Sequence, residues 1–209
     1  MQVVEKVTAF VTREGVNGRE LLIFRHPLNG LQLPAGTVEE GESPETAVMR
    51  EAAEETGLEG LVLKRPLGML HRVLPDNHFL VLGTTRLLAA PDAIAPPASE
   101  FIFYRGSYVR LLREQHSFAE VLMEEWAEPP RLLRREQGWL PRDWLTPHIH
   151  RYQYWLLCET ETAVSWTVFV DGHHFELFWT PLRPAPSLVW PQDEWLTAVY
   201  EALAVNRSS

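Results

Sequence analysis

Three glutamates are spaced so that their carboxylates would gather on one side of a helix. Residues 43–57 read SPETAVMREAAEETG, a run of helix formers between a capping serine and a glycine. Glu51, Glu54 and Glu55 stand three and four positions apart, so they share one helix face. Two carboxylates about 6 Å apart repel each other by roughly 3 kcal/mol at an effective dielectric near 20. The C-terminal end of the helix dipole also disfavours them, and a divalent cation such as Mg²⁺ or Mn²⁺ would relieve both effects.

The residues around these glutamates decide between a metal site and an ordinary solvated acidic face. Residues 36–58 read GTVEEGESPETAVMREAAEETGL. This segment resembles the Nudix box, G-x5-E-x7-R-E-U-x-E-E-x-G-U, in which U is a bulky aliphatic residue. Every glycine, acid and arginine of the box is in register. The one departure is Ala52 in the first U position, and we expect this small apolar side chain still to face the core.

The resemblance implies a role for each acid of the box. Nudix hydrolases cleave a nucleoside diphosphate linked to another moiety, with divalent cations holding the diphosphate while water attacks phosphorus. By position, Glu51 and Glu55 would be metal ligands. Glu54 would be the third acid, either a further ligand or the general base that takes the proton of the water. We favour the base role, although in this family the base sometimes lies on a distant loop.

Other box residues are expected to support the metal site. The backbone carbonyl of Ala35 or Gly36 would add a metal ligand, which requires a close approach of the chain. Arg50 and Glu42 resemble an ion pair that fixes the loop against the helix and supports catalysis by positioning. Gly57 would end the helix in the left-handed cap position.

A second group of candidates lies near the C-terminus, in the segment VDGHHFE of residues 170–176. In this family a further acid often comes from the loop before the last core strands, so Asp171 is a candidate metal ligand, with Glu176 behind it. His173 and His174 could bind substrate phosphate or a metal. They could equally be a hydrogen-bonded surface pair at a turn.

The fold that must position these residues is of the α/β class. Strands are expected at residues 3–13, 21–25, 61–64, 69–74, 79–83, 101–113, 118–127, 148–159, 164–170 and 175–182. Helices are expected from Pro44 to Thr56 and from Trp195 to Leu203, and Pro66 and Gly68 are expected to break the strand after the box. The resemblance implies a Nudix fold, an α/β/α sandwich with a mixed sheet. We expect one domain over residues 1–209, with a core at about 1–72 and 147–205 and a mainly antiparallel β insertion at about 73–146.

Composition excludes several classes of protein. The 209 residues are 45% hydrophobic and 22% charged, as in soluble globular domains, and no apolar run is long enough to span a bilayer. Charged residues near the N-terminus argue against a signal peptide, so we expect a soluble, cytoplasmic protein. A net charge of −9 disfavours a sequence-independent grip on nucleic acid. The arginine-rich stretch 131–142 could hold outer phosphates of a substrate, but a solvated edge is the simpler expectation.

Aromatic residues and the single cysteine admit mostly structural interpretations. All eight tryptophans fall in residues 126–195, where core packing is favoured over an aromatic wall for a nucleobase. Cys158 cannot form an internal disulfide and is expected in the core.

The substrate is the least determined property. The segment LPAG before an acidic loop resembles enzymes that act on ADP-ribose and other nucleotide sugars. Those enzymes often carry a proline about fifteen residues after the box, and Pro75 lies 17 residues beyond Leu58, near this position but off register. Nucleoside triphosphates, dinucleoside polyphosphates and coenzyme A stay open as substrates. A non-catalytic Nudix domain that senses a nucleotide is the alternative function, but such domains usually lack a box acid, and this chain has all of them. The insertion could also offer a surface for a homodimer or another partner.

Overall fold

The computed structural model describes residues 2–126, 131–170 and 172–204. The chain divides into two compact units. Residues 6–70 and 151–209 form one, which we call the α/β unit, and residues 1–5 and 71–150 form the other, the β unit. Strands β1, β5 and β11 each have residues in both units. No helix among the described residues is long and apolar enough to cross a membrane.

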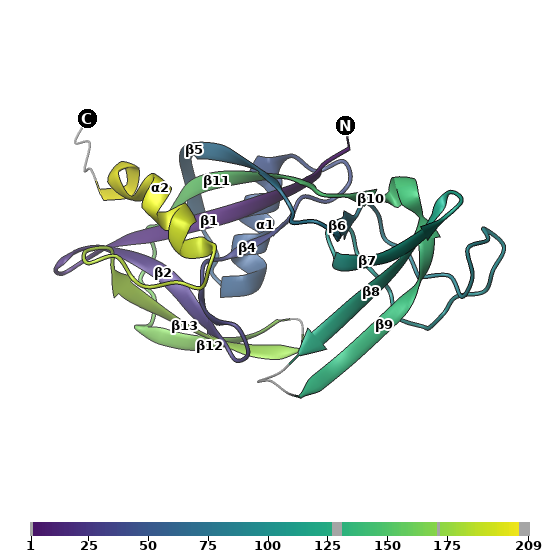
Figure 1. Ribbon diagram of the computed structural model, residues 1–209. Helices are drawn as coiled ribbons and strands as arrows, with labels where there is room; N and C mark the ends of the chain where they lie inside the picture. Colours follow the sequence, from purple (N-terminus) through teal and green to yellow (C-terminus); the bar gives the residue numbers. More distant parts are fainter. Residues whose placement is uncertain (1, 127–130, 171, 205–209) are drawn as a thin grey trace. The chain divides into compact units, whose positions relative to one another are not determined.

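One large sheet forms the framework of the α/β unit (Figure 1). Its order is β12-β13-β2-β1-β11-β5, with β3 paired to β2 and β4 paired to β1. The strands are β1 Val4–Gly15, β2 Gly18–His26, β3 Gly30–Gln32, β4 Ala35–Thr37, β5 Leu61–Val73, β11 His148–Cys158, β12 Ser165–Val170 and β13 His173–Pro181. The pairs β1–β2, β2–β13 and β13–β12 are antiparallel, whereas β11 runs in the same direction as β1 in Figure 1. The sheet is therefore mixed, as expected.

Two helices cover the two faces of this sheet. Helix α1 (Pro44–Thr56) contributes to one apolar cluster, which also contains Val7 and Val11 of β1. Helix α2 (Gln192–Ala204) contributes to a second cluster, which contains Phe10 of β1. Because successive side chains of a strand point to opposite faces, the two clusters lie on opposite sides of the sheet. The result is the expected α/β/α sandwich (Figure 1).

Helix α1 begins and ends where its capping residues predict. The hydroxyl of Ser43 accepts a hydrogen bond from the backbone N–H of Thr46, and Pro44 occupies the first turn. Gly57 takes the left-handed conformation with φ of 68°, and its N–H donates to the carbonyl of Ala53. Ala52 is fully buried in the core, so the small residue in this box position is accommodated.

The β unit contains a five-stranded antiparallel sheet in the order β10-β6-β7-β8-β9. Its elements are β6 His78–Val81, β7 Tyr108–Gln115, β8 Phe118–Trp126, β9 Leu132–Pro141, the short 3₁₀ helix Arg142–Trp144 and β10 Leu145–Thr146. Phe103, Val121 and Leu140 are among the buried residues of its core. The mainly antiparallel β structure expected in this part of the chain is confirmed.

Three expectations about elements need correction. Strand β5 runs unbroken through Pro66 and Gly68 because it is the last strand of its sheet, where a missing N–H is tolerated. The strand expected from residue 101 begins at Tyr108, since Phe103 forms only an isolated bridge with Thr85. Helix α2 begins at Gln192, three residues before the expected start at Trp195.

Core packing accounts for only some of the tryptophans. Trp139 and Trp179 are buried, whereas Trp126, Trp144 and Trp190 are among the exposed large hydrophobic residues. Cys158 is buried, as expected for a core cysteine.

Candidate active site

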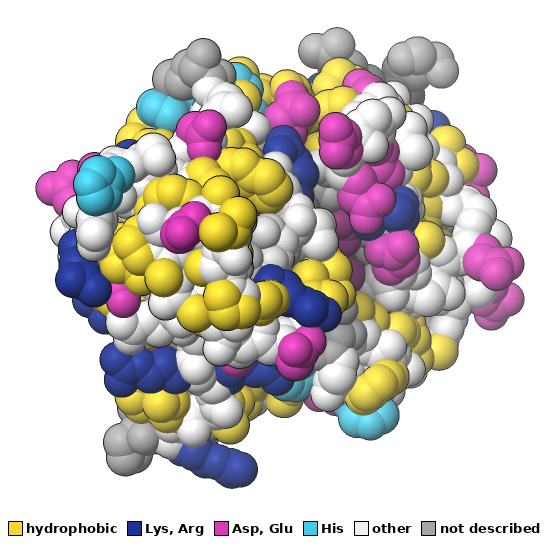
Figure 2. Space-filling view, turned by 90° about the vertical axis from the view of Figure 1, so that its right-hand side faces the viewer, with side chains coloured by type: hydrophobic (Ala, Val, Ile, Leu, Met, Phe, Trp, Pro, Cys, Tyr) yellow, Lys and Arg dark blue, Asp and Glu magenta, His cyan; other side chains and the backbone are white. Residues whose placement is uncertain are grey.

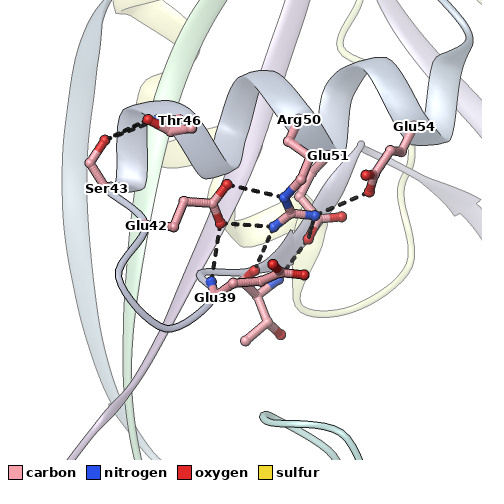
Figure 3. Close-up of polar contacts among 8 residues, drawn as sticks. Glu39, Glu42, Ser43, Thr46, Arg50, Glu51 and Glu54 are labelled. Carbon is pink, nitrogen blue, oxygen red and sulfur yellow. Dashed lines mark hydrogen bonds and ion pairs between the residues drawn. The ribbon is translucent and has the colours of Figure 1, made fainter.

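The loop before helix α1 is held against strand β1. Strand β4 pairs antiparallel with β1, so that Lys6 lies opposite Thr37, Val7 opposite Gly36, and Thr8 opposite Ala35. The chain then passes through Glu42 into the capped helix α1. This path brings Glu51 and Glu55 of helix α1 to residues 35–37. Figure 3 shows Glu51 beside Arg50 on the helix.

Glu51 lies directly against the backbone of β4. Its carboxylate accepts a hydrogen bond of 3.1 Å from the N–H of Thr37. A Cβ atom on Gly36 would stand 1.8 Å from the carboxyl carbon of Glu51, so only glycine permits this approach. The Glu51 side chain is 15% exposed. Burial raises its pKa, and the neighbouring Arg50 opposes that rise.

Glu55 and Glu54 have different partners. A carboxylate oxygen of Glu55 accepts from the N–H of Ala35 at 2.8 Å, so Glu55 joins Glu51 beside strand β4. Glu54 is 56% exposed and pairs with Arg50 at 3.1 Å (Figure 3). In the part of the chain that the structure describes, no three His, Cys, Asp or Glu side chains stand together as a group that could hold a metal ion. Glu51 and Glu55 are therefore brought together at the loop, while Glu54 turns toward the arginine.

Arg50 contacts both the loop and the acidic face of helix α1. It donates from Nε and Nη2 to the two carboxylate oxygens of Glu42, at 3.1 and 3.0 Å. Nη2 also donates to the carbonyl of Thr37 at 3.0 Å, and Nη1 pairs with Glu51 at 3.0 Å. The expected ion pair with Glu42 is present, and the arginine also binds the loop backbone, Glu51 and Glu54. The hydrogen bond from Arg50 holds the pKa of Glu42 below its ordinary value, and the pKa of Arg50 is raised by Glu42.

The donor atoms at the loop are chemically suited to a hard divalent cation. The carboxylates of Glu51 and Glu55 and the backbone carbonyls of Ala35 and Gly36 are all oxygen donors, the type that Mg²⁺ and Mn²⁺ prefer. The missing side chain at Gly36 leaves room for the carboxylate beside the backbone. These residues therefore fit the metal that the resemblance implies.

The candidates near the C-terminus have local partners in the α/β unit. Asp171 lies outside the described residues. His173 stands 5.1 Å from His26, ring centre to ring centre, and His174 stands 4.9 Å from Phe169. Glu176 forms an exposed ion pair of 3.5 Å with Arg25. These contacts join strands β2, β12 and β13, and none of them is a contact with the box helix.

Two residues that the sequence did not single out belong to this site. Thr37 binds Glu51 and Arg50 through its backbone. Lys6 is buried and donates from Nζ to the Thr37 hydroxyl at 3.0 Å. The alternation of VVEKVTAFV places Lys6 on the same strand face as Phe10, a signal that could have marked it as an inward-facing charge.

The arginine-rich stretch of the β unit is a solvated edge, as expected. Arg134 and Arg135 face Glu125 and Glu124 across strands, and Arg142 pairs with Glu114 at 2.6 Å. All of these arginine side chains are substantially exposed. On the face of the molecule in Figure 2, basic side chains are interspersed with acidic and hydrophobic ones.

Comparison with known proteins identifies the domain that contains the box. Residues 4–105 match the family model of the NUDIX domain. The chain carries a NUDIX domain. The matched residues include the whole box, strand β4 and helix α1, and the Nudix resemblance found in the sequence is confirmed.

Individual relatives are similar over different shares of the chain. ADP-sugar pyrophosphatase of Mus musculus is 54% identical over 41 residues, which are 19% of this chain and 19% of that protein. The match thus spans about a fifth of the length of that relative. Among solved structures, the NUDIX domain of Shewanella oneidensis NrtR complexed with ADP ribose has a TM-score of 0.49 at 12% identity, covering 97% of this chain and 90% of that chain. An Ap4A hydrolase of C. elegans has a TM-score of 0.44 at 14% identity, covering 97% and 98%.

Proposed function

We propose that this protein is a metal-dependent Nudix hydrolase that cleaves the diphosphate linkage of a nucleoside diphosphate joined to another moiety. The observation that carries the proposal is the intact box, folded so that Glu51 and Glu55 lie against the backbone of residues 35–37. A domain that only bound a nucleotide would not need this complete set of acids. The alternative function, a non-catalytic sensor, is therefore less well supported.

Each box residue has a role in the proposed reaction. Glu51, Glu55 and the carbonyls of Ala35 and Gly36 would hold the divalent cation, Mg²⁺ or Mn²⁺. The bound cation would neutralise charge on the phosphate oxygens and lower the pKa of a bound water. Glu54 is the exposed acid of the three, which supports its role as the base that accepts the proton of the attacking water.

Arg50 would act by positioning the loop. Its guanidinium ties Glu42 and the Thr37 carbonyl to helix α1, so that the acids keep their orientation during the reaction. Gly57 supports the same helix from its C-terminal end.

A nucleotide sugar such as ADP-ribose is the substrate class that we favour. The local similarity to an ADP-sugar pyrophosphatase supports it, as does the LPAG segment before the acidic loop. Asp171 is proposed as an additional metal ligand, and His173, His174 and Glu176 as side chains that contact the substrate. We also propose that the β unit is an insertion between the two parts of the Nudix core.

The decisive experiment is a substrate screen of the purified protein. Nucleotide sugars, nucleoside triphosphates, dinucleoside polyphosphates and coenzyme A are incubated with Mg²⁺ or Mn²⁺, and products are resolved by mass. We expect turnover of one class that EDTA abolishes. Binding without turnover across the whole panel would favour the sensor.

Variants of the box acids test the roles within the site. Glu54→Gln and Glu55→Gln should each lose two or more orders of magnitude in kcat, roughly the cost of removing a general base or a metal ligand. Glu59→Gln, which changes an exposed acid beyond the box, is the control and should keep wild-type activity. Wild-type turnover by both box variants would contradict the assignment.

A further inference from the structure

Strand β1 carries a lysine whose burial is unusual. Lys6 is only 8% exposed, although lysine is among the residues least often buried in proteins. It faces Thr37 directly in the β1–β4 register, and its Nζ donates to the Thr37 hydroxyl at 3.0 Å. Because a buried charge is costly, its retention next to the box loop calls for an explanation.

Thr37 uses all three of its polar groups at this point. Its hydroxyl accepts from Lys6, and its N–H donates to the carboxylate of Glu51 at 3.1 Å. Its carbonyl accepts from Arg50 at 3.0 Å. One residue thus links the buried ammonium on β1 to both charged partners on helix α1.

A second buried cation supports the same strand pair. Arg151 of strand β11 donates from Nη1 to the carbonyl of Val7 and to the hydroxyl of Thr8, each at 3.0 Å. Val7 and Thr8 lie opposite Gly36 and Ala35, whose carbonyls are among the proposed metal ligands. The guanidinium of Arg151 is covered by the ring of Trp195, 4.1 Å away. Buried cations therefore fix β1 along the whole length of its pairing with β4.

We propose that Lys6 is a positioning residue of the metal site, which acts through Thr37. Its ammonium fixes the Thr37 side chain, so that the neighbouring N–H stays aimed at Glu51 and the backbone of Gly36 keeps its close approach to that carboxylate. Side chains that orient metal ligands in this way contribute strongly to metal affinity. This inference rests on the proposed function, because the metal that Lys6 would serve is the one the hydrolase requires.

The test measures Mn²⁺ binding to the full chain by calorimetry. Wild type is compared with Lys6→Met, which removes the charge at similar volume, and with Lys6→Arg, which restores it. The chain has one other lysine, Lys64, which is exposed, so Lys64→Met is a matched control. We expect Lys6→Met to weaken Mn²⁺ binding about 10-fold or more, Lys6→Arg to recover most of it, and Lys64→Met to bind like wild type.

A thermal unfolding curve of each variant separates positioning from simple stabilisation of the fold. If Lys6→Met is less stable but binds Mn²⁺ as tightly as wild type, Lys6 is only structural and the inference is overturned. If wild type itself binds no Mn²⁺, the proposed function fails together with the inference. If wild type binds Mn²⁺ and Lys6→Met binds it equally tightly, the inference is overturned while the proposed function stands.

Variants of Thr37 keep the inference testable if Lys6→Met does not fold. Thr37→Ser retains the hydroxyl and should bind Mn²⁺ like wild type, whereas Thr37→Val should weaken binding as Lys6→Met does. Both variants keep the backbone bonds of residue 37. Where all variants fold, the double variant Lys6→Met/Thr37→Val should lose no more Mn²⁺ affinity than either single variant, because the two residues act as a unit. If the losses of Mn²⁺ affinity are fully additive, Lys6 does not act through Thr37.

Discussion

At the scale of single residues, Gly36 has the strictest requirement in the site. A side chain there would occupy the space of the Glu51 carboxylate, 1.8 Å from the position of a Cβ atom. The requirement is therefore one of space, since Gly36 is not among the glycines with positive φ. The box pattern marks this glycine, but only the structure gives the reason for it.

The substitution Gly36→Ala should displace Glu51 from the loop. We expect a loss of at least about 10-fold in Mn²⁺ affinity, the usual cost of disturbing the orientation of a ligand, and a destabilisation of about 1–3 kcal/mol from overpacking. Calorimetry with Mn²⁺ and urea unfolding measure the two effects. Unchanged metal affinity would show that the Glu51 carboxylate does not depend on its contact with Gly36.

The pair Glu42–Arg50 predicts a dependence of stability on pH. Because its pKa is lowered in the folded protein, ionised Glu42 stabilises the fold above its ordinary pKa of 4.5, and this contribution is lost as the pH falls through the lower folded value. Glu42→Gln should therefore lose stability at pH 7 and show a shallower decline below pH 4.5. Urea unfolding of wild type and variant at a series of pH values checks this. Parallel stability curves would contradict the prediction.

At the scale of elements, helix α1 shows which structures a sequence can predict. Its N-terminal cap, its proline and its final glycine are local signals, so its bounds of Pro44 to Thr56 follow from the residues themselves. The break expected at Pro66 and Gly68 does not occur in strand β5. A proline interrupts a strand that pairs on both sides, but β5 is an edge strand, and its place at the edge is not visible in the sequence.

The candidate site shows the same contrast between local signals and long-range contacts. The box pattern predicts Glu51, Glu55, Arg50 and Glu42 as site residues, because their spacing along one helix and loop is a local property. Lys6 and Thr37 meet only through the pairing of β1 with β4, across 31 positions of sequence. Contacts that depend on strand register cannot be read from a linear motif.

The cap of helix α1 can be tested separately from the chemistry. Ser43→Ala removes the acceptor for the Thr46 N–H and should cost about 1 kcal/mol of stability. Ser43→Asp, which can also cap, should restore it. Urea unfolding distinguishes the two, and an alanine variant as stable as wild type would mean that the serine cap contributes nothing measurable.

At the scale of the whole molecule, metal binding should stabilise the folded chain. A ligand that binds only the native state at about 100 times its Kd adds about 2.7 kcal/mol of stability. We therefore expect Mn²⁺ to raise the Tm of wild type but to leave that of Glu55→Gln nearly unchanged. Differential scanning calorimetry with and without EDTA measures this. An equal rise in both proteins would place the stabilising ion outside the box.

The pairing of β1 with β4 also bears on protein engineering. The box is a continuous segment, and it is tempting to graft residues 36–58 alone onto another scaffold. Such a graft would carry over the acids and the arginine, but it would leave behind the strand that lines up with residues 35–37. The transplantable module therefore begins at β1, which brings along Lys6, the cation that lies opposite Thr37.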